Sequence, residues 1–97
     1  MSLIHYENDF DKLIEKEAVV DFYATWCGPC KMFGPIFEEV GEGSDINFIK
    51  VDVDKYSDIA RSYGVMTIPT TILFRDGKEV KRNIGFMSEE EFIDFLK

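Results

Sequence analysis

The spacing of apolar and polar residues along the chain predicts several short strands. Residues 18–24 are apolar apart from Asp21 and the hydroxyl of one tyrosine, a pattern typical of a central strand covered by helices on both faces. Residues 46–51 and 70–74 are two further strand-like runs, and the second is rich in β-branched side chains. Residues 4–6 suit a short first strand. We therefore expect a sheet whose middle strand is buried.

Helical periodicity fills the intervals between these strands. Four stretches place apolar side chains three and four positions apart, as one buried helix face requires. In the second stretch Pro35 removes a backbone donor, so we expect a kink there. The apolar positions are Phe10, Leu13 and Ile14; Met32, Phe33, Ile36, Phe37 and Val40; Tyr56, Ile59, Ala60 and Tyr63; and Phe92, Phe95 and Leu96. The expected starting residues are Asn8 or Asp9, Cys27, Asp54, and Ser88 with its capping box to Glu91; Gly41 with Gly43, and Gly64, are expected terminators.

A turn signal near the C-terminus fixes the order of the elements. Asp76-Gly77 separates residues 70–74 from residues 79–84, which predicts an antiparallel hairpin. The predicted order is βαβαβαββα, with parallel units first and the hairpin last. This order indicates an α/β fold in which a central mixed five-stranded sheet is flanked by four helices. With 97 residues and no repeat or linker, we expect a single domain, residues 1–97.

Composition narrows the classes of partner. The formal net charge of −8 argues against nucleic acids and anionic membranes, because both are polyanions. No apolar run approaches the roughly 20 residues that span a bilayer, and residues 1–6 lack the features of a signal peptide. We therefore expect a cytoplasmic protein. No Gly-rich nucleotide motif occurs, so we expect no bound cofactor.

The two cysteines of the chain lie three positions apart in Cys27-Gly28-Pro29-Cys30, where a strand is expected to meet a helix. A helix N-terminus favours the thiolate through its unpaired N–H groups and dipole, so Cys27 suits the attacking nucleophile. Cys30 lies one turn further on, where we expect it to sit deeper and resolve the mixed disulfide. A structural disulfide would constrain so small a loop little, and a zinc site needs more ligands than two thiols and His5 supply unless the chain dimerises. We therefore expect no metal and favour thiol–disulfide exchange.

The chain resembles the thioredoxin family over nearly its whole length. Trp26-Cys27-Gly28-Pro29-Cys30-Lys31 matches the family's active-site motif residue for residue. Further similarity covers residues 20–26, Pro35, residues 50–54, 63–70 and 74–77, and Gly85. The resemblance implies a thioredoxin fold and a monomeric protein-disulfide reductase. It also implies disulfide-containing protein substrates and recharging by an NADPH-dependent thioredoxin reductase.

The resemblance assigns roles to further residues. It implies that Asp21 lies behind the disulfide and assists proton transfer to and from the buried cysteine, with Lys50 nearby. It also implies a cis bond before Pro69, next to the disulfide. Left to the residues alone, Asp21 and Lys50 could be solvated strand residues, Pro69 could follow an ordinary trans bond, and Trp26 could belong to the core. The docking surface implied for substrates comprises Trp26, Gly28, Pro29, Ile68 and Gly85.

Three positions depart from the family pattern. Tyr23 replaces a common tryptophan, Gly34 replaces a common alanine, and Phe86 stands where a smaller residue is usual. These departures bear on stability and partner preference. Two other functions stay open: an oxidase or isomerase on the same fold, which the Gly-Pro pair between the cysteines disfavours, and a binding module that uses its thiols little.

Overall fold

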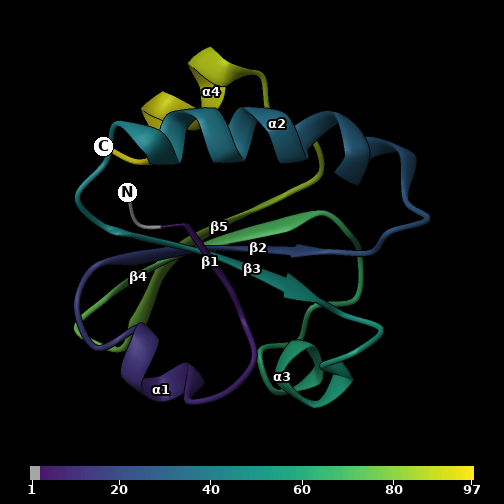
Figure 1. The fold of residues 1–97 in the computed structure, drawn as a ribbon, viewed down its shortest axis with the longest axis vertical. Helices are drawn as coiled ribbons and strands as arrows, with labels where there is room; N and C mark the ends of the chain where they lie inside the picture. The colour runs from purple at the N-terminus through teal and green to yellow at the C-terminus, as the bar shows by residue number, and fades with distance from the viewer. Residues whose placement is uncertain (1–2) are drawn as a thin grey trace.

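The computed structural model describes residues 3–97, and its elements follow the predicted order βαβαβαββα (Figure 1). The strands are β1 (Leu3–His5), β2 (Ala18–Tyr23), β3 (Asn47–Asp52), β4 (Thr70–Arg75) and β5 (Lys78–Ile84). The helices are α1 (Phe10–Leu13), α2 (Gly28–Glu42), α3 (Ser57–Ser62) and α4 (Glu89–Phe95). Met1 and Ser2, the start of the segment compared with signal peptides, lie outside the described residues. No helix within residues 3–97 has the length and apolar character needed to cross a membrane.

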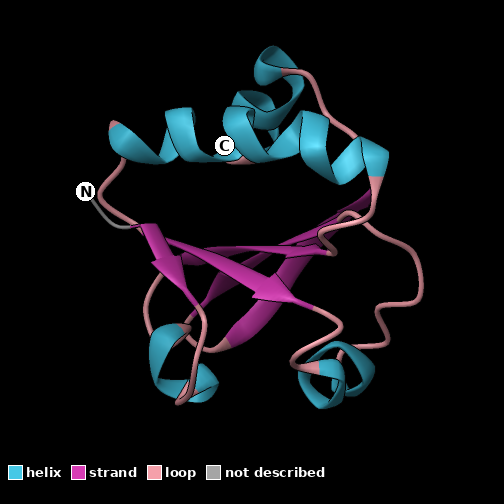
Figure 2. Ribbon diagram, turned by 45° about the vertical axis from the view of Figure 1, so that its right-hand side comes forward, coloured by secondary structure: helices cyan, strands magenta, loops and turns pink. Residues whose placement is uncertain are grey.

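The sheet has the strand order β1-β3-β2-β4-β5, which confirms the predicted mixed five-stranded sheet. β3 runs parallel to β1 and β2, whereas β4 is antiparallel to β2 and β5 is antiparallel to β4. Helices α2 and α4 cover one face of the sheet, and α1 and α3 cover the other (Figures 1 and 2). The central position of β2 explains why its sequence is apolar on both faces.

Side chains alternate between two core layers along each inner strand. Val19 on β2 and Phe48 on β3 pack with the helix residues Phe33, Phe37 and Phe92, on the side of α2 and α4. The next residue along each strand, Val20 on β2 and Ile49 on β3, packs on the opposite side, with α1 and α3. Because side chains two apart in a strand share a face, the residues that follow Val19 and Phe48 by two positions also point toward α2. This alternation places Asp21 and Lys50 on the side of the sheet that α2 covers.

The buried face of α2 differs from the prediction at two places. Met32 is 63% exposed, so its assignment to the buried face was wrong. The buried stripe instead includes Phe37 and Gly41, four positions apart and so on one helix face. Gly41 lies inside the helix, where a Cβ would come within 2.9 Å of the Phe48 ring, and only Gly43 is the C-cap. Gly41 therefore permits close approach of α2 to β3.

Two of the predicted helix starts are also corrected. Asp9 occupies the N-cap position of α1, but its side chain makes no capping hydrogen bond there. Asp54 does not cap α3, whose N-cap residue is Tyr56. The Asp54 carboxylate is engaged by Trp26 instead. By contrast, the capping box from Ser88 is present, and the predicted hairpin turn is made by Asp76 and Gly77 with positive φ angles of 54° and 79°.

Candidate active site

The two cysteines lie where β2 gives way to α2. Cys27 is the N-cap residue of α2, and Cys30 lies in its first turn. They form a disulfide with their Cα atoms 5.2 Å apart. The Cys30 backbone N–H donates to Cys27 Sγ at 3.2 Å, so this sulfur receives one of the unpaired donors of the helix N-terminus. In the dithiol form the same donor and the helix dipole would stabilise a Cys27 thiolate.

Solvent exposure does not separate the two cysteines in the disulfide form. Cys27 is 6% exposed and Cys30 is 5% exposed. The expected greater depth of Cys30 is therefore not seen in these areas. What distinguishes the pair is the position in the helix, because Cys27 is the one that accepts the N–H donor. Both sulfurs pack in a small apolar cluster with Ala24, bordered by Tyr23 and Ile68.

The segment before β4 places a cis peptide bond beside the disulfide. The Ile68–Pro69 bond is cis, as the family resemblance implied. Cys27 Sγ lies 3.9 Å from the carbonyl oxygen of Ile68. Gly85, with a positive φ of 102°, donates its N–H to the Pro69 carbonyl at 2.8 Å. Of the expected docking surface, Ile68 thus lies beside Cys27 Sγ, Gly85 is hydrogen-bonded to the neighbouring Pro69, and Gly28 follows Cys27 at the start of α2.

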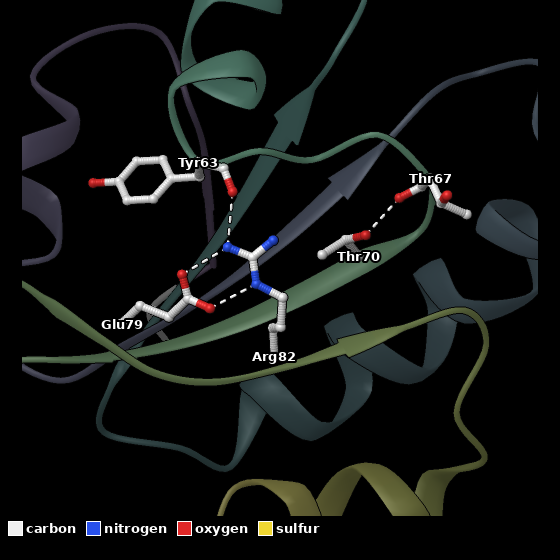
Figure 3. Close-up of polar contacts among 5 residues, drawn as sticks. All are labelled: Tyr63, Thr67, Thr70, Glu79 and Arg82. Atoms are coloured by element: carbon white, nitrogen blue, oxygen red, sulfur yellow. Dashed lines mark hydrogen bonds and ion pairs between the residues drawn. The ribbon is translucent and has the colours of Figure 1, made fainter.

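A polar clasp anchors the segment that leads to this bond (Figure 3). Arg82 donates to both carboxylate oxygens of Glu79, at 2.6 and 2.7 Å, and to the carbonyl of Tyr63 at 2.8 Å. Thr70 donates from its hydroxyl to the carbonyl of Thr67. The Arg82 hydrogen bonds also lower the pKa of Glu79. Sequence reasoning missed this clasp, because a bulge in β5 is what puts residues three apart on one face.

Trp26 lies at the surface beside the cysteines. It is 68% exposed, so the core alternative is excluded. Its indole N–H donates to Asp54 at 2.8 Å, which fixes the ring orientation. Gly28 and Pro29 are also exposed, and Phe86 is 41% exposed while its ring meets Phe33 edge-on. The surface around the disulfide is therefore apolar and open to a partner. Sequence reasoning identified Asp54 only as a helix cap.

Asp21 is buried in the middle of the sheet. Only 1% of it is exposed, which rules out a solvated strand edge. Burial raises its pKa to about 7; the positive charge of Lys50 opposes this rise and the negative charge of Glu38 adds to it. Its Oδ1 atom has no hydrogen-bond partner among the described residues. The carboxyl group can therefore gain and lose a proton near neutral pH.

Lys50 is held by two groups rather than by solvent. Its side chain is 10% exposed, and its Nζ atom lies 3.0 Å from Glu38. The same ammonium lies 4.8 Å from the centroid of the Tyr23 ring, within reach of a cation–π interaction. A crevice of about 300 Å³ connects these groups to the redox helix. Its lining includes Tyr23, Cys30, Gly34, Glu38 and Lys50. The solvated alternative for Lys50 is thus wrong.

This arrangement can make and break one disulfide at the start of α2. Within residues 3–97 no three His, Cys, Asp or Glu side chains are grouped so as to hold a metal ion. The fold and the cysteine pair define a thiol–disulfide oxidoreductase.

Comparison with known proteins gives the family. The Thioredoxin family model matches residues 2–97. A thioredoxin of Mycoplasmoides gallisepticum is 47% identical over 100 residues, covering all of both chains, and one of Mycoplasma genitalium is 47% identical over 83 residues, covering 84% of this chain and 81% of that one. The structure of a mutant thioredoxin from Halobacterium salinarum superposes with a TM-score of 0.91 at 33% identity, covering 98% of this chain and 88% of the other. The structure of reduced Schistosoma mansoni thioredoxin pre-protein superposes with a TM-score of 0.87 at 39% identity, covering 99% of this chain and 96% of the other. The chain belongs to the thioredoxin family.

Proposed function

We propose that the protein reduces disulfide bonds in other proteins with Cys27 and Cys30 as the reacting thiols. The observation that supports this most directly is the disulfide between Cys27 and Cys30 at the N-terminus of α2. A thiol pair in this position can pass two electrons to a substrate and be left as a disulfide.

In the first step the Cys27 thiolate attacks a sulfur atom of the substrate disulfide. A new bond joins Cys27 to that sulfur, and the other substrate sulfur leaves as a thiolate that takes a proton from solvent. The helix N-terminus supports this assignment, because the Cys30 N–H donates to the Cys27 sulfur. The exposed Trp26 and the carbonyl of Ile68 would orient the substrate chain at this stage.

In the second step Cys30 loses its proton and attacks Cys27 Sγ. The mixed disulfide breaks, the Cys27–Cys30 bond forms, and the second substrate sulfur leaves as a thiolate. Asp21 is the base that accepts the Cys30 proton and later returns it; Asp21 does not itself line the crevice, which Cys30 and Lys50 open to solvent. This role is supported by the burial of Asp21, by its pKa of about 7, and by the lining of that crevice by Cys30 and Lys50.

The oxidised form then needs two electrons to act again. We propose an NADPH-dependent thioredoxin reductase as their source, acting on a monomeric, single-domain chain in the cytoplasm. Trp26, Gly28, Pro29, Ile68 and Gly85 form the surface that both substrates and this reductase contact. The membership of the thioredoxin family and the exposed apolar surface around the disulfide support this assignment.

An insulin-reduction assay with NADPH and a bacterial thioredoxin reductase tests the proposal. We expect NADPH consumption and insulin precipitation that depend on this protein and vanish in Cys27→Ser. If wild type oxidises reduced peptides but does not reduce insulin, the protein is an oxidase. If a partner complex retains its full activity with Cys27→Ser, the protein serves as a binding module and the reductase proposal fails.

A further inference from the structure

Thr71 on β4 lies directly opposite Asp21 on β2. The two residues are register partners in the antiparallel pair of strands, so their side chains share one face of the sheet. That face is the one covered by α2, because Leu73, two positions along β4, packs there. Thr71 is fully buried and Asp21 nearly so. A threonine hydroxyl therefore sits in the apolar layer beside the carboxyl group that would move the proton.

These two residues also share an unusual hydrogen-bonding state. Thr71 Oγ1 and Asp21 Oδ1 are the buried side-chain oxygens that have no partner within residues 3–97. Leaving a buried polar group without a hydrogen bond is unfavourable, so such groups are rare in folded proteins. Directly opposed Cβ atoms in an antiparallel pair lie roughly 4.5–5.5 Å apart. The Thr71 hydroxyl makes no hydrogen bond to Asp21 in this conformation, so a change of the Thr71 side-chain rotamer or one bridging water is what would satisfy both oxygens.

We propose that Thr71 is a positioning residue for Asp21. Its hydroxyl donates a hydrogen bond, directly or through one water, to the Asp21 carboxylate that exists before the Cys30 proton is accepted. The bond stabilises the basic form of Asp21 in a site that burial makes unfavourable for charge. This inference rests on the proton-transfer role proposed for Asp21.

Among the groups that surround Asp21, Thr71 is the one we expect to donate a hydrogen bond to its carboxylate. From β3 the cation that acts on Asp21 is Lys50, and its ammonium is paired with Glu38 of α2. On β2 the nearby titratable side chain is Tyr23, whose own pKa is raised by burial. From α2 Cys30 is held in the disulfide. From β4 the contribution is the uncharged hydroxyl of Thr71, which can donate in every state of its neighbours.

An NMR titration of the Asp21 side-chain carbon in the oxidised protein tests the proposal. Thr71→Val removes the hydroxyl and keeps the shape, and we expect the pKa of Asp21 to rise by about one pH unit. Thr71→Ser restores the hydroxyl, and we expect less than roughly a third of that rise. An unchanged pKa in Thr71→Val, or equal rises in both variants, would overturn the proposal.

The stability of Thr71→Val relative to wild type, measured by denaturation at pH 5.5 and pH 9, is a second test. It separates a hydroxyl that bonds the Asp21 carboxylate from one that has no partner. If Thr71 bonds the carboxylate, Thr71→Val loses about tenfold more in its folding equilibrium constant at pH 9 than at pH 5.5, since one pH unit of pKa is a factor of ten. If the hydroxyl is truly unpartnered, Thr71→Val is as stable as wild type or more stable at both values, and the proposal is wrong. A failure of the proton-transfer role proposed for Asp21 would look different. In that case Asp21→Asn would resolve the mixed disulfide as fast as wild type, while Thr71→Val would still raise the pKa of Asp21.

Discussion

Asp21 and Lys50 are register partners in adjacent parallel strands, yet the ammonium group of Lys50 is paired with Glu38 of α2. A lysine in direct contact would lower the pKa of a carboxyl group strongly. Because Lys50 is drawn aside, burial dominates and the pKa of Asp21 reaches about 7. A carboxyl group whose pKa is raised this far can both accept and return a proton near neutral pH, as the role proposed for Asp21 requires.

The first prediction concerns the pH dependence of stability. The native pKa of Asp21 is raised above its unfolded value of about 3.9, so its contribution to stability falls as pH rises from there and levels off above the native value. Asp21→Asn cannot ionise and should be more stable than wild type at pH 8, by on the order of 1–4 kcal/mol. Denaturant midpoints across pH 5–9 should show the gap between the two proteins widening up to about pH 7 and staying constant above it. An Asn variant that is less stable at pH 8 would contradict this interpretation.

The second prediction concerns the two charges that act on Asp21. Lys50→Met removes an attractive charge and should raise the pKa of Asp21, whereas Glu38→Gln frees the ammonium and should lower it. Each change should be about one pH unit or less. Glu39→Gln removes the same charge from a neighbouring position and is the matched control. Changes of the same sign in Lys50→Met and Glu38→Gln would refute the arrangement.

The third prediction uses Trp26 as a reporter of the redox state. The indole is fixed by Asp54 and adjoins Cys27, where a disulfide quenches its emission. Reduction should therefore raise the intrinsic fluorescence. Asp54→Ala should weaken this response, because it releases the ring, and Asp45→Ala at a position away from the indole should leave it intact. Equal emission from both redox forms of wild type would mean that the ring is turned away from the disulfide.

Much of the fold was predictable because its signals are local. The apolar run of β2, the Asp76-Gly77 turn and the Ser88 capping box each depend on a few neighbouring residues. The errors arose where tertiary contacts decide the outcome. Gly41 was expected to end a helix, but it lies against the Phe48 ring, and Asp54 was expected to cap one, but it binds Trp26.

The candidate site was predictable in part for the same reason. The spacing of the two cysteines was enough to predict that they form a disulfide-exchanging pair. The cis bond before Pro69 was expected from the family resemblance and not from the residues themselves. The ion pair between Lys50 and Glu38 depends on how α2 lies over the sheet. The position of Thr71 opposite Asp21 depends on the register of β2 and β4. The clasp of Arg82 depends on a bulge, which no local pattern predicts.

The central claim is that Cys27 attacks and Cys30 resolves, and trapping of mixed disulfides tests it most directly. Cys30→Ser and Cys27→Ser are each incubated in reduced form with a disulfide-bonded peptide, and covalent adducts are quantified by intact-protein mass spectrometry. Because Cys27 sits at the N-cap of α2 and accepts its N–H donor, Cys30→Ser should accumulate the adduct and Cys27→Ser should form almost none. Equal trapping by the two variants, or trapping confined to Cys27→Ser, would contradict the account.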